Sequence, residues 1–355
     1  MPWNVAIGPS QGNWTVPSNV VSIIVDCIGP GAHGQPGGSG LGAMPGGAGG
    51  GGGAYSRRTM AVTPGQVISY YVGEANSGTY TQFGPNYCLA YGAVGQSGGN
   101  ANNGVGDVRY WGGNGGAGGG IYATKGPGGG GGGGGGAAGY LGNGGAGATG
   151  GTVTGDKNEP GSGGAGGASG SGYGGGGGNE GSGGNGLEYG SWGAGGGGGG
   201  GRGGIYIIGT DYGRHGGPGG AWGAGSGGGG GMGGGTGSVP GSMYASVGGL
   251  LMIYYDPVPA PTVTGCTPNN GPISGGTAVT ITGSNFTGVS SVTIGGVAAT
   301  SVSVPNANTI TCVTPAHVPG LVSIGVTAIG GGATGVNLFT YIAPKGGSNM
   351  PMMGI

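Results

Sequence analysis

The chain has 355 residues, of which 115 are glycine, so a conventional hydrophobic core cannot extend through its whole length. Charged residues make up 5% of the chain and the formal net charge is -1, which excludes the basic surface that binds nucleic acid or an anionic membrane. We therefore expect no nucleic acid partner. No run of residues reaches the roughly 20 apolar residues of a membrane span, so we also expect no membrane insertion.

The N-terminal region predicts a small β-sheet. Residues 20–27 are rich in β-branched side chains with alternating apolar positions, the pattern of a strand. Residues 59–63 and 66–72 flank a Pro-Gly dipeptide at 64–65 and predict a hairpin. The apolar run 250–255 predicts the last strand of this region. Since consecutive and terminal strands are often neighbours, we expect a sheet that gathers both ends of the glycine-rich region and forms its base.

Long glycine tracts lie between these strands, some of them interrupted by alanine or proline. They cover residues 46–53, 126–136, 174–178, 195–201 and 227–231. One interpretation is a disordered linker, because glycine loses the most backbone entropy on ordering. The other is an array of extended polyproline II-type glycine helices whose N–H groups bond to neighbouring strands. Glutamate and lysine are sparse and aromatic residues recur between the tracts, which favours the ordered interpretation.

The composition changes at residues 256–261, where three prolines at alternate positions favour an extended linker. Beyond it, short alternating runs separated by Gly, Pro and Asn turns predict an antiparallel β-sandwich. The predicted strands are residues 278–282, 291–294, 309–313 and 321–327. We therefore divide the chain into a glycine-rich domain at 1–256, a proline linker at 257–261, a sandwich domain at 262–343 and a C-terminal tail at 344–355.

Two turn motifs, Gly275-Gly276-Thr277 and Gly283-Ser284-Asn285-Phe286, occur in register with these strands. With them, the last quarter of the chain closely resembles the IPT/TIG family of immunoglobulin-like domains. The resemblance implies an immunoglobulin-like sandwich. In phage proteins such domains look like accessory modules on capsid or tail parts, although the fold alone assigns no partner.

The N-terminal part carries a second series of motifs. In order along the chain these are Trp14-Thr15-Val16-Pro17, Ile23-Ile24-Val25, Ala54-Tyr55, Val62-Thr63-Pro64-Gly65-Gln66 and Tyr71-Val72-Gly73. By this order the region is similar to glycine-rich domains of phage tail and other virion proteins, and its tracts are similar to the polyglycine sandwich of distal tail-fibre adhesins. The resemblance implies a mainly β fold in which a small β base carries a polyglycine II bundle, followed by the C-terminal sandwich.

The sequence offers no apparatus for catalysis. His33, His215 and His317 are isolated, and the carboxylates show no paired spacing. The many Gly-x-Gly-x-x-Gly matches follow from composition alone. Residues 156–161 begin like a calcium loop but place proline at the fifth position. The four cysteines form no Cys-x-x-Cys pair, so we expect no metal, no cofactor and no enzymatic activity.

The cysteines Cys266 and Cys312 allow two interpretations. They could face each other in the sandwich and form a disulfide. The favoured interpretation is that both are small buried apolar residues, because phage parts assemble in a reducing cytoplasm.

Aromatic residues that interrupt the glycine tracts are the candidates for receptor contact. These are Tyr140, Tyr173, Tyr189, Trp192, Tyr212 and Trp222. The favoured interpretation is that they pack across the glycine array. The alternative is that chain reversals expose them at a tip, where aromatic faces bind sugar rings or protein loops with little loss of entropy.

The function expected from these features is that of a bacteriophage virion surface structural protein. It would belong to a fibre, a tail tip or a head appendage and would mediate attachment to a host surface. The start of the chain shows no export signal, which fits a part assembled in the host cytoplasm and released by lysis. The expected partners are other virion proteins of the capsid, tail or fibre, further copies in a homo-oligomer, and a host surface glycan or outer-membrane protein.

Two other functions remain open at this stage. One is a capsid decoration protein without a receptor role. The other is an ice-binding or extracellular matrix protein that uses a flat polyglycine face.

Overall fold

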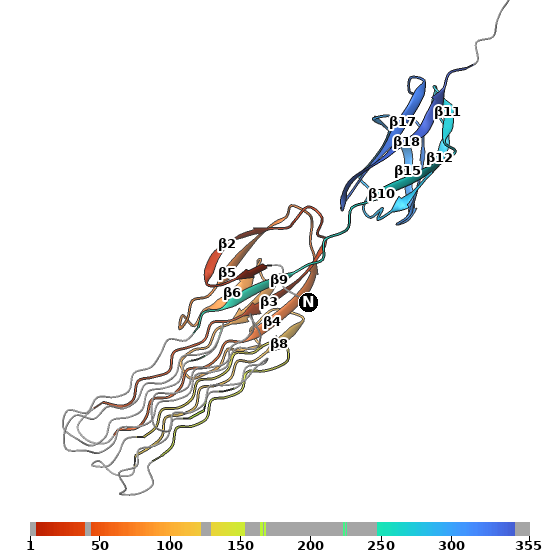
Figure 1. Cartoon of the computed structure of the whole chain (residues 1–355). Coiled ribbons are helices and arrows are strands. Elements are labelled where there is room, and N and C mark those ends of the chain that lie inside the picture. The colour runs from red at the N-terminus through yellow and green to blue at the C-terminus, as the bar shows by residue number, and fades with distance from the viewer. Residues whose placement is uncertain are drawn as a thin grey trace, which may run out of the picture. The chain divides into compact units, whose positions relative to one another are not determined.

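The structure is a computed structural model that describes residues 5–39, 44–121, 129–152, 164–165, 167, 223, 225 and 247–344. The described residues form strands and contain no helix, so the predicted mainly β character is confirmed (Figure 1). The chain divides into two compact units. The first holds Met1–Thr15, Ile23–Met60 and Val67–Tyr255, and the second holds Val16–Ser22, Ala61–Gln66 and Asp256–Ile355.

Two sheets form the base of the first unit. A five-stranded sheet has the order β1 (Val5–Ile7), β9 (Leu250–Tyr254), β3 (Ser22–Ile28), β4 (Tyr55–Ala61) and β8 (Val108–Tyr110). A four-stranded sheet has the order β2 (Ser10–Thr15), β5 (Val67–Val72), β6 (Tyr80–Phe83) and β7 (Cys88–Tyr91). The pairing of β3 with β9 confirms that an early strand and the last strand of this region are neighbours, with Val25 opposite Ile253.

The predicted hairpin around residues 64–65 is wrong. The turn itself forms, because the Gln66 N–H donates to the Thr63 carbonyl at 2.9 Å and Gly65 has a φ of 77°. The strands on its two sides nevertheless enter different sheets, since β4 lies between β3 and β8 whereas β5 pairs with β2 and β6. A turn dipeptide fixes a reversal of the chain, but burial decides which strand becomes the partner.

The two sheets of the base contact each other through buried side chains. The Ser56 hydroxyl of β4 donates to the Leu89 carbonyl of β7 at 2.6 Å, and the Thr81 hydroxyl of β6 donates to the Ile28 carbonyl of β3 at 2.7 Å. Polar groups between the sheets are therefore satisfied by main chain. The fully buried apolar side chains there each contribute roughly 1.5–3 kcal/mol to stability.

Extended glycine-rich segments run out from the base side by side (Figure 1). We call their described parts the glycine array. It consists of a first segment (29–38), a second (45–54), a third (112–120), a fourth (129–138) and a fifth (144–151). Its glycines avoid positive φ throughout these five described ranges.

Main-chain hydrogen bonds join the segments at every third residue. The N–H groups of Gly46, Gly49 and Gly52 in the second segment donate to carbonyls of the third segment at 2.9–3.0 Å. The same spacing joins the first segment to the second and the third to the fourth. A β-ladder repeats every second residue, so this network is a different way of satisfying extended main chain.

The fourth segment shows that the array is more than one layer of strands. Its Gly132 and Gly135 N–H groups donate to the second segment at 2.8 and 2.7 Å. Its Gly133 and Gly136 N–H groups instead donate to the fifth segment at 2.9 and 3.0 Å. Successive residues therefore donate hydrogen bonds to different neighbouring segments, and the bond to the same segment recurs after three residues.

This close approach requires glycine at the contact positions. A Cβ atom on Gly132 would lie 1.9 Å from the Gly116 carbonyl oxygen, and one on Gly116 would lie 2.0 Å from that of Ala148. Larger residues occupy solvent-facing positions spaced by three. On the third segment and the residue before it, they are Trp111, Asn114 and Ala117; on the fifth segment and its flanks, they are Asn143, Ala146, Thr149 and Thr152.

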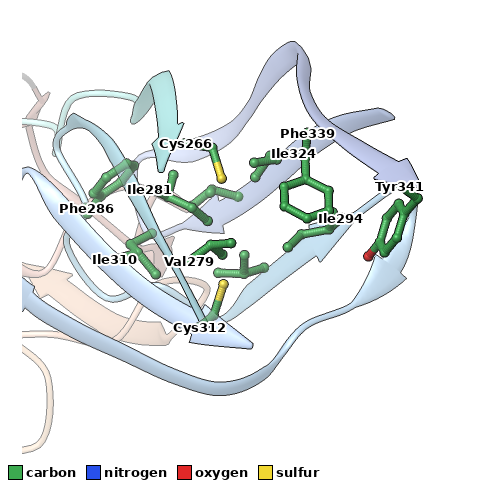
Figure 2. Close-up of a cluster of buried hydrophobic side chains, with 12 residues drawn as sticks. Cys266, Val279, Ile281, Phe286, Ile294, Ile310, Cys312, Ile324, Phe339 and Tyr341 are labelled. Carbon is green, nitrogen blue, oxygen red and sulfur yellow. The ribbon is translucent and has the colours of Figure 1, made fainter. Parts of the chain in front are cut away.

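The second unit contains the predicted sandwich. One sheet has the order β10 (Thr262–Thr267), β12 (Ala278–Ser284), β16 (Thr309–Val313) and β15 (Thr300–Asn306). The other has the order β11 (Asn270–Pro272), β18 (Gly331–Ile342), β17 (Gly320–Ala328), β13 (Ser291–Ile294) and β14 (Val297–Ala298). Ile281 and Ile310 from the first sheet pack with Ile324 and Phe339 from the second (Figure 2). The four strands predicted here from alternation are all present.

Candidate binding groove

An open groove of about 680 Å³ lies beside the glycine array in the first unit. The loop after β7 supplies one wall, and the beginnings of the third and fifth glycine segments supply the other. The larger side chains among its lining are Tyr91, Val94, Asn100, Asn103, Trp111, Asn114 and Asn143. None of the described residues that line the groove is charged.

Trp111 is placed by the end of the edge strand β8, which it follows directly. Its main-chain N–H donates to Oδ1 of Asn143 at 2.8 Å, which ties the third segment to the chain entering the fifth. Its side chain is 42% exposed and lines the groove. The indole is therefore held on a fixed main chain while much of its ring surface stays accessible.

Three of the four asparagine side chains in the groove use their oxygens in hydrogen bonds to main chain. Oδ1 of Asn114 accepts from the Gly98 N–H at 2.8 Å, and Oδ1 of Asn100 accepts from the Asn102 N–H at 2.8 Å. Within the described ranges no hydrogen bond involves Nδ2 of Asn100, Asn114 or Asn143, and Asn103 forms none through its side chain. The groove thus offers amide donors beside an aromatic ring.

A separate polar cluster lies within the five-stranded sheet. Asp26 of β3 is 1% exposed and accepts from the Tyr55 hydroxyl at 2.7 Å and from Nε and Nη2 of Arg57 at 2.6 Å each. Burial, followed by the negative charge of Asp26, raises the pKa of Tyr55 far above its usual range. The Arg57 guanidinium also lies over the Tyr254 ring, 5.8 Å from its centroid. The buried Asp26 carboxylate is therefore paired with both the Arg57 guanidinium and the Tyr55 hydroxyl.

The residues proposed from sequence for receptor contact lie mainly outside the described residues. This applies to Tyr173, Tyr189, Trp192, Tyr212 and Trp222. Tyr140 is described and lies at the turn between the fourth and fifth segments, 49% exposed and away from the groove lining.

His317 is held in the sandwich by its local contacts. His317 stacks on Tyr341 with ring centroids 5.0 Å apart, and its ring nitrogens bond to the Val318 and Gly295 carbonyls at 2.8 and 3.2 Å. His215 lies outside the described residues. No group of three His, Cys, Asp or Glu side chains in the described part of the chain is arranged to hold a metal ion. Nor do the described residues include a helix long and apolar enough to cross a membrane.

The possible disulfide between Cys266 and Cys312 is not formed, because both are free thiols in the sandwich core (Figure 2). Cys266 of β10 pairs with Ile281 of β12, and Cys312 of β16 pairs with Val279 of the same strand. One strand therefore separates them, which places their Cα atoms roughly 10 Å apart at about 4.8 Å per strand. A disulfide needs a Cα separation below about 7 Å, so the fold prevents this pairing.

The environment of these two cysteines predicts a pH-dependent stability of the sandwich. Burial raises the pKa of both thiols from 9.0 to about 11. As the pH rises from 9.0 towards 11, the unfolded chain loses thiol protons that the folded chain keeps, so the stability falls. In the full chain at pH 8, we expect iodoacetamide to alkylate both cysteines at least ~100-fold more slowly than in concentrated urea, as followed by mass spectrometry. A native rate equal to the rate in urea would contradict this burial.

Sequence reasoning did not identify Trp111 and its asparagine neighbours. A usable signal was present in the triplets Trp111-Gly-Gly, Asn114-Gly-Gly and Ala117-Gly-Gly, which place one larger side chain at every third residue. In the structure these three residues are exposed.

Comparison with known proteins identifies an IPT/TIG domain at residues 261–341. No curated protein matches the chain. Among solved structures, SGBP-B from a complex xyloglucan utilization locus in Bacteroides uniformis is similar at 24% identity and a TM-score of 0.21, over 25% of this chain and 26% of that protein. The full extracellular region of plexin A4 is similar at 28% identity and a TM-score of 0.22, over 25% of this chain and 9% of that protein. The similarity thus spans about a quarter or less of either protein's length.

Proposed function

We propose that this chain is a bacteriophage virion surface structural protein, part of a fibre, a tail tip or a head appendage, that mediates attachment to a host surface. The N-terminal motifs support this role because they resemble the glycine-rich domains of phage virion proteins. The IPT/TIG domain adds an immunoglobulin-like module of a kind that many surface proteins carry. Its partners would be other virion proteins and further copies of the chain.

In this proposal the glycine array is a bundle of polyglycine II helices. Such a helix has three residues per turn, so residues three apart face the same neighbour. The three-residue spacing of the main-chain hydrogen bonds agrees with this period. The bonding of the fourth segment to neighbours on several sides and the lack of positive φ among the described glycines of the array agree with it as well.

The observation that carries the proposal is this network of main-chain bonds. It provides a way to build a stiff body with few apolar side chains and almost no charge. A flexible glycine linker would leave its N–H groups to water and could not hold a binding surface in a fixed place. A stiff projection that carries a binding surface is what attachment to a host requires.

The presence of the chain in the virion is the direct test. Particles of the phage that encodes the chain would be purified on a density gradient, digested with chymotrypsin and measured by mass spectrometry. Chymotrypsin is preferable to trypsin because the chain has 17 tyrosines but only eight lysines and arginines. We expect peptides from both units in the particle fraction, and antibodies against the full chain should block adsorption. A chain absent from purified particles would rule the proposal out, and hundreds of copies per particle without blocked adsorption would favour capsid decoration.

A further inference from the structure

The groove contains side-chain groups that neither packing nor hydrogen bonds within the described ranges occupy. The Trp111 ring is partly exposed, and the Nδ2 groups of Asn100, Asn114 and Asn143 are free of hydrogen bonds within the described ranges. The Asn103 side chain is exposed and likewise unbonded there. Together these groups suit a ligand that has both an apolar face and hydrogen-bond acceptors.

A neutral saccharide has this combination of surfaces. One face of a pyranose ring carries C–H groups that pack on an aromatic ring, and its hydroxyl and ring oxygens accept hydrogen bonds from amides. The described lining has no charged side chain, so it offers nothing to offset the charge of an acidic sugar or of a phosphate. The chemistry of the groove therefore favours uncharged sugar units.

The shape and rigidity of the groove favour a polysaccharide chain over a single sugar. The groove is open to solvent and is not an enclosed pocket. Gly112, Gly113 and Gly144 present only main chain to the groove, and the space that a Cβ would fill at each of them faces neighbouring main chain. The main-chain bonds of the array hold Trp111 and Asn114 in place before binding, which reduces the entropy lost on association.

We propose that the groove around Trp111 is a binding site for a neutral polysaccharide, with the indole as the platform for a sugar ring and the asparagine Nδ2 groups as donors. This inference rests on the proposed attachment function, for which it names the class of receptor. Tyr140, the described residue among the sequence-predicted receptor contacts, lies outside the lining of this groove.

The experiment uses the purified full chain on a printed array of bacterial polysaccharides, both neutral and acidic. A neutral polysaccharide that binds would then be cut into oligosaccharides and titrated by calorimetry. We expect binding to at least one neutral polysaccharide and weaker or no binding to acidic ones. We expect Trp111→Ala to lower the affinity at least ~10-fold and Asn103→Ala to lower it several-fold, as for the loss of an aromatic contact and of one hydrogen bond. Trp111→Tyr should keep part of the affinity because it retains a ring.

Leu141→Ala is the matched control. Leu141 is a large apolar side chain, 63% exposed, in the same unit but outside the groove lining, so its removal should leave binding unchanged. Far-ultraviolet circular dichroism would verify that each variant is folded.

An array on which no neutral polysaccharide binds would overturn the proposal, as would unchanged affinity in Trp111→Ala. If Tyr140→Ala abolished binding and Trp111→Ala left it unchanged, the binding site would lie at the turn and the proposal would also be overturned. Binding to a host outer-membrane protein but to no polysaccharide would mean that the receptor is a protein surface, and this result would overturn the proposal. The printed polysaccharides are tested with the purified chain alone. A chain that binds sugar but is absent from particles would therefore refute the virion role without refuting the binding site in the groove.

Discussion

Replacing Gly116 with valine is expected to destabilise the glycine array by about 3 kcal/mol or more, the upper range for overpacking, because main chain cannot move aside as a side chain can. Its Cβ would lie 2.0 Å from the Ala148 carbonyl oxygen. The same residue donates to the Gly133 carbonyl at 2.7 Å and accepts from the Gly49 N–H at 2.9 Å. A shift that relieves the clash would therefore weaken bonds to two other segments.

The neighbouring residue supplies the control. Ala117 already carries a Cβ and faces solvent, so Ala117→Val should change the stability by no more than about 0.5 kcal/mol, as is usual at exposed sites. Amide hydrogen exchange read by mass spectrometry over residues 112–120 would compare the two variants. Exchange that is equally slow in both would mean that the segments are not packed through main chain.

Replacing Asp26 with alanine is expected to cost about 3 kcal/mol, the lower end for breaking a buried ion pair, because Arg57 is a third exposed and regains some hydration. The variant leaves the Arg57 guanidinium without its carboxylate and the buried Tyr55 hydroxyl without its acceptor. Denaturant unfolding followed by tryptophan fluorescence would measure the loss, since all five tryptophans precede the IPT/TIG domain.

Removing both charges separates the two causes of this loss. Asp26→Leu combined with Arg57→Leu replaces the pair by apolar side chains and should recover much of the stability. Asp26→Asn keeps an acceptor for the Tyr55 hydroxyl and should fall between alanine and the wild-type residue. A double variant as unstable as Asp26→Ala would indicate that the sheet depends on the Tyr55 bond and not on the ion pair.

Much of the β structure could be predicted because it follows from side-chain patterns. The sandwich strands alternate apolar and polar residues, and their turns carry recognisable motifs, so β12 and β16 were found close to their true bounds. The partner of β5 was not found, because alternation identifies a strand without saying which sheet it joins. The sequence could not decide whether Cys266 and Cys312 form a disulfide, because only the strand order places β12 between their strands.

The groove was harder to predict than the strands. Asn143 bonds to Trp111 across 32 residues, and this contact depends on the alignment of glycine segments that have almost no side chains to specify it. The aromatic residues chosen from the sequence were those that interrupt the glycine tracts. Trp111 does not belong to that set because it precedes its glycine segment. Its spacing of three residues from Asn114 is the signal in the sequence that indicates it.

The triplet arrangement of the glycine array also limits how such a chain can evolve. Positions that face a neighbouring main chain are closed to every residue except glycine, whereas Trp111, Asn114, Ala117, Asn143 and Ala146 stand on the open face. Mutations that survive selection should therefore collect at these positions and leave the backbone unaltered. A lineage of these proteins could then acquire new binding preferences quickly without redesigning its scaffold.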